Sequence, residues 1–407
     1  MENFTFYAPT YFDFGRDAEM HVADLIKQFG GSRVLLHYGG GSIKKSGLYN
    51  RVCRILEQAG LVVFELGGVL PNPRSGLVYK GVSLCKKENI DFILAVGGGS
   101  TIDSAKAIAA GSLYDGDVMD FYRNKVEIRR ALPIGTILTI AAAGSEGSPN
   151  TVITDEETQV KKGTKSDVLR PRFSIMNPEL TCTLPPYQTA SGATDIMIHV
   201  CERYFSNTEE VEVTDRLCEA ILKTMIHETP RVMKEPGNYD ARANIMWAGM
   251  LAHNNICGVG RVQDWASHHM EHELSALYDV THGAGLAVIA PLWMRYVLKL
   301  NPHKLVQFAT RVWDIPMQED NPEKTALKGI EAFEKFLRDI GMPSCFEEIG
   351  AREEDIEQMA DKLMNGRKTE GNYVRLTRKD VIEIYQSAGN GGNYGSERIS
   401  SSNGRTG

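Results

Sequence analysis

One short stretch of the chain is dense in side chains that could bind a metal. The segment SHHMEHELSALYDVTHG, residues 267–283, holds four of the chain's ten histidines. His268 and His272 are four residues apart, so a helix would place them on one face. His282 follows a predicted break in that helix and would approach from a neighbouring element. Imidazoles gathered in this way are a candidate metal site.

A second pair with helical spacing lies upstream in TASGATDIMIHVCERY. Asp195 and His199 are four residues apart, and the apolar residues around them predict a buried face. The pair could form a simple hydrogen bond, but a buried carboxylate and imidazole without partners would be costly. One divalent ion would satisfy both pairs, and this donor set suits iron or zinc as well as nickel or cobalt. His269 lies off the shared face and has no predicted role.

The motif HHMEH also allows a second interpretation. It matches H-x-x-E-H, the inverted zinc-protease motif, in which His268 and His272 would bind zinc and Glu271 would act as the base. This interpretation is disfavoured because it leaves two glycine-rich loops without a function. It stays a remote alternative.

The first of these loops is AVGGGSTIDSAK, residues 95–106. Its three glycines fall between a predicted strand and a predicted helix, where the backbone can approach a ligand closely. A helix N-terminus offers free N–H donors and favours anions, so the loop predicts phosphate binding. The motif G-x-G-x-x-G is absent, and a plain strand-to-helix turn is the alternative.

The second glycine-rich loop is LHYGGGSIKK, residues 36–45. A site for a free ribose 2′-hydroxyl normally offers an acidic side chain, and none follows this strand. The loop instead offers Ser42, glycine amides and two lysines, Lys44 and Lys45. It therefore favours a 2′-phosphate, with a solvated lysine face as the alternative.

Short apolar segments alternate with amphipathic ones over the first 180 residues. Strands are predicted at 33–38, 61–66, 91–96, 132–140 and 172–177, with helices at 43–60 and 76–89 among them. This alternation predicts a doubly wound, mostly parallel α/β sheet.

The pattern changes after the prolines at 185 and 186, where helical spacing takes over. We therefore predict an α/β domain over residues 1–184 and an all-α domain over 185–387. The remaining segment, 388–407, is rich in Gly, Ser and Asn and is predicted to be a flexible tail.

Composition narrows the classes of function. A net charge of −7 gives no basic field for nucleic acid, and no run of 18 apolar residues predicts a membrane span. No signal peptide is evident at the N-terminus, and the seven cysteines contain no C-x-x-C pair. The odd, dispersed set of cysteines predicts reduced thiols, so we expect a cytoplasmic protein.

The motifs GGGSTIDSAK, LTIAAAGSE, NPELTCTLPP, ASGATDIMIHVCERY and SHHMEHELSALYDVTHG occur in this order. Together they resemble the iron-containing (group III) alcohol dehydrogenases, in particular the branch of butanol dehydrogenases and broad-range aldehyde reductases. The resemblance spans roughly residues 1–385. It implies the two-domain architecture shared with dehydroquinate synthase-like enzymes, an active site in the cleft between the domains, and a homodimer.

The resemblance also implies roles for individual residues. The metal ligands would be Asp195, His199, His268 and His282, and His272 would lie beside the metal without binding it, where it could relay a proton. The implied cofactor contacts are Gly40, Gly41, Ser42, Asn72, Gly98, Gly99, Ser100, Asp103, Thr139 and Lys161. The loop at 39–45 resembles the branch that uses NADP(H).

The chain departs from the family pattern at two positions: Ala143 stands where a threonine is common, and Asn177 where an aspartate is common. The implied function is a metal-dependent NAD(P)(H) oxidoreductase that interconverts butanol-like primary alcohols and aldehydes, with NADP(H) preferred. A glycerol dehydrogenase-like or dehydroquinate synthase-like enzyme on the same scaffold is the alternative.

Overall fold

The computed structural model describes residues 1–389, and a six-stranded sheet organises its first half. The strand order is β1, β8, β5, β4, β2, β3, and every neighbouring pair is parallel. The strands are β1 (Tyr11–Phe14), β2 (Arg33–Gly39), β3 (Val62–Val69), β4 (Phe92–Gly97), β5 (Ile134–Leu138) and β8 (Phe173–Met176). The predicted parallel sheet is confirmed, and its five expected strands correspond to β2, β3, β4, β5 and β8.

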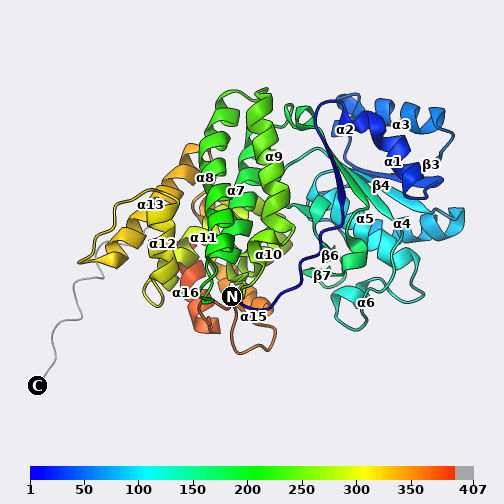
Figure 1. Ribbon diagram of the computed structural model, residues 1–407. Coiled ribbons are helices and arrows are strands. Elements are labelled where there is room, and N and C mark those ends of the chain that lie inside the picture. The colour runs from blue at the N-terminus through cyan, green and yellow to red at the C-terminus, as the bar shows by residue number, and fades with distance from the viewer. Residues whose placement is uncertain (390–407) are drawn as a thin grey trace, which may run out of the picture.

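Helices cover both faces of this sheet (Figure 1). They are α1 (Val22–Gln28), α3 (Leu48–Gln58), α4 (Ser75–Glu88) and α5 (Gly99–Ser112). Alternate residues of a strand face opposite sides: Val34 and Leu36 pack among side chains of α1 and α3, whereas Leu35 and Ile93 pack among those of α4 and α5. The sheet is therefore buried on both faces, which explains the continuous apolar runs of its strands.

Three features of this half differ from the sequence-based expectation. Strand β1 was not expected, nor was the antiparallel hairpin of β6 (Asn150–Asp155) and β7 (Val160–Lys165). The helix expected at 43–60 is divided into α2 (Ser42–Lys45) and α3, because Gly47 takes a φ of 79°, outside the helical region. One further short helix, α6 (Met119–Tyr122), precedes β5.

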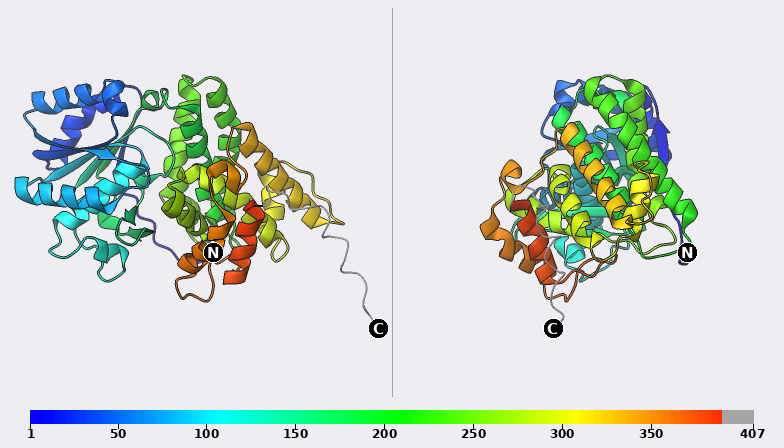
Figure 2. Two further views of the ribbon diagram at one scale, coloured as in Figure 1. Left: turned by 180° about the vertical axis from the view of Figure 1, so that it is seen from behind. Right: turned by 90° about the vertical axis from the view of Figure 1, so that its left-hand side faces the viewer.

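The second half of the described chain is helical and packs beside the sheet (Figure 2). Its helices are α7 (Pro186–Tyr204), α8 (Glu212–Lys234), α9 (Tyr239–His253), α10 (Ala266–Tyr278), α11 (His282–Leu298), α12 (His303–Arg311), α13 (Pro322–Asp339), α14 (Phe346–Ile349), α15 (Ile356–Met364) and α16 (Arg378–Gly389). Short 3-10 helices join the elements: η1 (Ala18–His21), η2 (Ser145–Gly147), η3 (Asp167–Leu169), η4 (Pro178–Thr181), η5 (Ile256–Gly258) and η6 (Glu353–Asp355). The predicted tail at 388–407 lies outside the described residues, apart from the two that end α16.

Helix α7 is the centre of this bundle, with α8, α9 and α11 packed around it (Figure 1). Pro186 occupies its first turn, where the missing N–H costs nothing. From Thr189 to Tyr204 the helix is buried on every side, as a central helix must be. Polar side chains on α7 are therefore held in an apolar environment and need specific partners. No helix within residues 1–389 combines the length and apolarity needed to cross a bilayer.

Candidate active site

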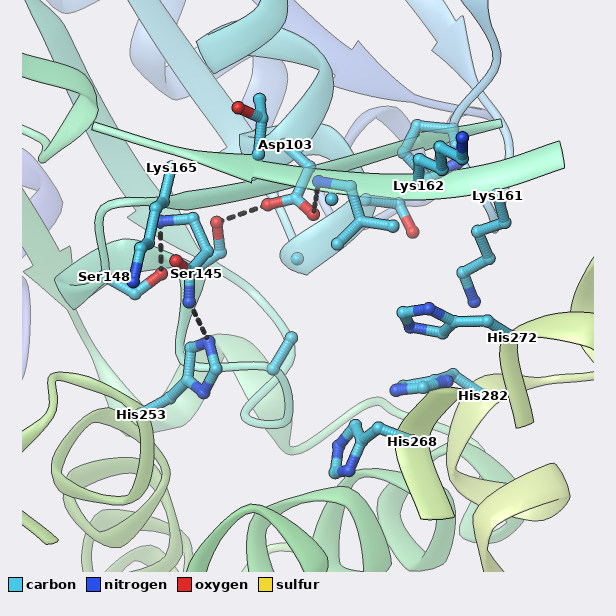
Figure 3. A pocket seen from close by; sticks show the side chains of 18 of the residues that line it. Asp103, Ser145, Ser148, Lys161, Lys162, Lys165, His253, His268, His272 and His282 are labelled. Atoms are coloured by element: carbon cyan, nitrogen blue, oxygen red, sulfur yellow. Dashed lines mark hydrogen bonds between the residues drawn. The ribbon is translucent and has the colours of Figure 1, made fainter. Parts of the chain in front are cut away.

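A cavity of about 1720 Å³ lies between the carboxyl end of the sheet and the helical half. Loops after β2, β4 and β5, the β6–β7 hairpin, and helices α7, α10 and α11 all line it. In Figure 3, His268, His272 and His282 point into this space from the helical side, and Lys161 faces them from the hairpin. Ligands of open α/β sheets bind at the carboxyl ends of the strands, so the position is that of an active site.

Four buried polar atoms on residues that line this cavity lack a hydrogen-bond partner. One is Nε of Arg203, and the other three lie close together: Oδ1 of Asp195, Nδ1 of His199 and Nε2 of His268. The Asp195 oxygen lies 3.3 Å from His199 Nδ1 and 3.9 Å from His268 Nε2. It also lies 3.8 Å from Nε2 of His282. Buried polar atoms without partners are rare and costly, and a divalent cation among these four side chains would satisfy them. The donor set fits a metal ion.

The four side chains do not contribute equally to this geometry. Asp195, His268 and His282 each place one ligand atom within 4.8 Å of the other two. His199 is not part of that group, although its Nδ1 adjoins Asp195 and its ring stacks on that of His268 at 4.6 Å between centroids. A second group within 4.8 Å joins Glu271, His272 and His282. The assignment of His199 as fourth ligand stays a prediction.

The break between α10 and α11 brings His282 to the site. Helix α10 ends at Tyr278 and is capped by Asp279, whose φ of 54° is left-handed and whose N–H donates to the carbonyl of Ser275. Helix α11 then begins at His282. The chain thus turns between the two histidines, and His268 and His282 converge on Asp195 from different helices.

A buried carboxylate that was not expected from the sequence, Glu202, fixes His268. Its Oε1 lies 2.9 Å from His268 Nδ1 and also accepts from the Ser267 hydroxyl and the His268 amide. Its Oε2 accepts from the amide of Trp265. Burial lowers the pKa of His268, but the neighbouring carboxylates of Asp195 and Glu202 outweigh it and raise the pKa to about 9. With Nδ1 held by Glu202, Nε2 is directed at Asp195, as expected of a metal ligand with an outer carboxylate.

A second buried carboxylate, Glu271, orients His282 as Glu202 orients His268. It is fully buried, and its carboxylate contacts Nδ1 of His282 and the hydroxyl of Ser275. Lys161 Nζ lies 3.7 Å from the same carboxylate. Burial raises the pKa of Glu271, but the neighbouring His282 and Lys161 charges outweigh it and lower the pKa to about 2. Glu271 is thus an ionised partner of His282.

The glycine-rich loop at 97–100 lies at the opposite side of the cavity. Gly98 precedes the first turn of α5, and Gly99 and Ser100 are in that turn; all three line the cavity. A Cβ on Gly99 would lie 2.8 Å from Cβ of Ala143, so the close packing requires glycine. Asp103 also lines the cavity, but its carboxylate accepts from the Ser145 hydroxyl and the Val152 amide.

The loop after β2 contributes Gly40 and Ser42 to the cavity lining. Gly41 precedes α2 with a φ of 119°, a conformation that glycine adopts readily. Lys44 does not line the cavity. Its Nζ lies over the rings of Tyr38 and Tyr49, 5.0 and 4.5 Å from their centroids.

Asn72 and Lys161 tie the hairpin to the helical half. Lys161 Nζ donates to Oδ1 of Asn72, and Nδ2 of Asn72 donates to Oδ1 of Asp279, both at 3.0 Å. Thr139 lies in the cavity wall after β5, and its N–H donates to the carbonyl of Gly97. All three of these sequence-predicted residues therefore border the cavity.

The two halves of the chain each match a family model. Residues 9–178 match the model of iron-containing alcohol dehydrogenases, and residues 189–389 match the C-terminal model of the Fe-containing alcohol dehydrogenase family. The chain belongs to the iron-containing alcohol dehydrogenase family. The resemblance noted in the sequence is confirmed.

Relatives and solved structures of iron-containing alcohol dehydrogenases match over nearly the whole chain. The probable NADH-dependent butanol dehydrogenase 2 of Bacillus subtilis is 44% identical, over 95% of this chain and 100% of that protein. The NADPH-dependent aldehyde reductase YqhD of Escherichia coli is 36% identical over the same shares. The crystal structure of NADH-dependent butanol dehydrogenase A from Thermotoga maritima superposes with a TM-score of 0.92, at 41% identity, covering 96% of this chain and 99% of that one.

In this member of the iron-containing alcohol dehydrogenases, sequence reasoning missed several residues that shape the cavity. Glu202, Arg203 and His253 are buried polar residues on α7 and α9. A signal was available for Arg203, which continues the four-residue spacing of Asp195 and His199. Glu202 and His253 have no such spacing, and only the packing of the helices brings them to the site.

Proposed function

We propose that this chain is a metal-dependent NAD(P)(H) oxidoreductase that interconverts primary alcohols and aldehydes. The observation that carries the proposal is the set of three unpartnered buried atoms on Asp195, His199 and His268, which lie close together. The glycine-lined N-terminus of α5 lies at the other side of the same cavity. The relatives named as butanol dehydrogenases and aldehyde reductases support the same activity. That the protein is a cytoplasmic homodimer stays a prediction.

Residues on one side of the cavity would bind the metal, and residues on the other side would bind the cofactor. Asp195, His199, His268 and His282 would hold a divalent ion, iron or zinc, while Glu202 and Glu271 keep two of the imidazoles oriented. The ion would supply Lewis acidity toward a substrate oxygen. Gly98, Gly99 and Ser100 would bind the phosphates of a nicotinamide cofactor, which carries the hydride.

His272 would relay the proton that the substrate oxygen gains or loses. It lines the cavity, its ring centroid is 5.7 Å from that of His282, and Lys161 faces it (Figure 3). Burial and then the Lys161 charge lower the pKa of His272 well below its usual value.

For His272→Ala we expect turnover to fall by about a hundredfold to ten-thousandfold, the contribution of a positioned proton carrier. Metal occupancy should stay near the wild-type value, since Asp195, His268 and His282 are unchanged. Metal analysis and kcat on the same preparation check this. Loss of metal comparable to that of a variant lacking His268 would make His272 a ligand instead.

The cofactor is proposed to be NADP(H) in preference to NAD(H). The support is the loop at 39–45, where Ser42 and glycine backbone line the cavity without an acidic side chain. Lys44 lies over two aromatic rings and neither it nor Lys45 lines the cavity, so Ser42 and backbone amides remain as partners for a 2′-phosphate. The Bacillus relative is named NADH-dependent and the Escherichia one NADPH-dependent, so the names leave the choice open.

We expect kcat/KM to favour NADPH over NADH by at least tenfold, because each hydrogen bond to the charged phosphate is worth about 1.5–3 kcal/mol. Gly40→Asp should invert the preference, and a Cβ at Gly40 meets no atom within 4 Å. Gly40→Ala is the matched control, because it adds the Cβ without the charge. A wild-type enzyme that favours NADH by tenfold would refute the assignment.

One assay separates this function from its alternatives. Metal-loaded protein is mixed with NADPH and butanal, and the absorbance of the reduced nicotinamide is followed together with the butanol formed. A dehydrogenase consumes one cofactor for each aldehyde reduced. A dehydroquinate synthase-like enzyme would show no net change in the cofactor, and a protease would instead cleave casein without it. Either of those results would overturn the proposal.

A further inference from the structure

Arg203 lies at the helical side of the cavity, on the same face of α7 as Asp195 and His199. The three residues follow one another at intervals of four, and Arg203 comes one turn, about 6 Å of helix rise, after His199. It lines the cavity and is 2% exposed. A permanent positive charge is therefore buried one helical turn beyond the candidate metal site.

Within residues 1–389, no carboxylate pairs directly with this charge. One terminal nitrogen donates to the carbonyl of His199 at 2.6 Å, and the other lies 3.1 Å from Nδ1 of His253. Nε has no hydrogen-bond partner, and the guanidinium carbon lies 4.5 Å from the ring of Trp265. Among residues 1–389, no Asp or Glu oxygen forms an ion pair with Arg203 within 4.0 Å.

Other buried cations that line the cavity do have acidic partners. Lys161 Nζ is 3.7 Å from Glu271, and Arg170 Nε is 2.9 Å from Asp167. A buried cation without a counterion is strongly destabilising. Arg203 therefore calls for an anionic partner that this chain does not supply, such as a bound ligand.

The hydrogen bonds around His253 leave a second donor, on Asn150, at the wall of the same cavity. Arg203 can only donate, so Nδ1 of His253 must accept and the ring proton is on Nε2. Nε2 lies 2.9 Å from Nδ2 of Asn150. Two donors cannot pair, so the amide nitrogen and oxygen of Asn150 must be exchanged, and Nε2 then donates to the oxygen. The amide nitrogen of Asn150 then turns away from His253, and Asn150 lines the cavity.

We propose that Arg203 and Asn150 form a carboxylate subsite, and that the preferred substrates are short ω-oxo carboxylates and the matching ω-hydroxy acids. This inference rests on the proposed function, because the aldehyde end must reach the site formed by Asp195, His268 and His282. One turn of helix separates Arg203 from His199, which suits a chain of two or three methylenes. The carboxylate forms no bond in the reaction: hydride goes from NAD(P)H to the aldehyde carbon and a proton to its oxygen.

The test compares 4-oxobutanoate with its uncharged amide, 4-oxobutanamide, on metal-loaded enzyme. For the wild type we expect kcat/KM to favour the acid by at least about tenfold, mostly through a lower KM, because the hydrogen bonds to a charged group are the strong ones. Arg203→Gln should reduce this ratio to about one, and Arg203→Lys should restore part of it. The ratio corrects for any change in the amount of active enzyme.

A second measurement, inhibition of the wild-type enzyme, does not depend on whether the variants fold. Butanoate should inhibit butanal reduction by the wild type competitively with the aldehyde, and butanamide should inhibit at least about tenfold more weakly.

Equal rates on the acid and the amide, or a ratio that Arg203→Gln leaves unchanged, would overturn the subsite and leave the proposed function intact. Failure to reduce butanal, 4-oxobutanoate and 4-oxobutanamide alike would overturn the proposed function itself. Inhibition by inorganic phosphate equal to that by butanoate would make Arg203 a general anion site and also overturn the substrate assignment.

Discussion

His268→Ala is expected to give a folded protein without bound metal and with turnover lowered by about a thousandfold or more. The substitution removes Nε2, one of the three unpartnered atoms around Asp195. The fold should persist because Glu202 keeps three other donors: the amides of Trp265 and His268 and the hydroxyl of Ser267. Metal analysis after dialysis, circular dichroism and steady-state rates measure the three quantities.

His269→Ala is the matched control for this variant. His269 is on the same helix, but its imidazole is partly exposed and contacts Glu370 instead of Asp195. It should keep its metal and its turnover. Full metal occupancy in His268→Ala would contradict the assignment, because the ion would then be held by other residues.

Gly283→Ala is expected to lower the free energy of unfolding by about 1–3 kcal/mol or more, as in an overpacked core. A Cβ at this position would lie 2.0 Å from the carbonyl oxygen of Ser191, so α11 must move away from α7. His282 is the preceding residue and would move with it, away from Asp195. Because a misplacement of about 1 Å can cost about a hundredfold in rate, turnover should fall by about that factor.

Gly237→Ala serves as the control, because a Cβ there meets no atom within 4 Å. Denaturant unfolding and kcat on both variants measure the effect. If Gly283→Ala unfolds at the wild-type denaturant concentration and keeps its rate, then the close approach of α7 and α11 does not position His282.

The sequence was informative about the site wherever helical spacing connects the residues. Asp195 with His199, and His268 with His272, could be paired because residues four apart on one helix share a face. Spacing alone could not show that His282 and Asp195 approach to 3.8 Å, because that distance depends on how α7 and α11 pack. For the same reason Glu202 was missed as the partner of His268.

The fold was predictable to a similar degree. The buried parallel strands were found from their apolar runs, whereas β1 was missed because it is short and only partly buried. The β6–β7 hairpin was missed because β7, with the sequence VKKGTK, has three lysines and one valine and gives no alternating apolar signal. The helix expected at 43–60 is interrupted at Gly47, which takes a left-handed backbone conformation. The apolar spacing around Gly47 is helical, so the pattern alone could not predict this break.

The measurement that tests the central claim most directly is a metal titration of the stripped wild-type protein. Chelator-treated enzyme is supplied with increasing Fe²⁺ or Zn²⁺ under anaerobic conditions, and aldehyde-dependent NADPH oxidation is followed alongside the metal bound. If Asp195, His199, His268 and His282 hold the catalytic ion, activity rises in proportion to occupancy and stops rising at a single ion per chain. Full turnover in the stripped protein, or saturation with metal that leaves the rate unchanged, would contradict the account.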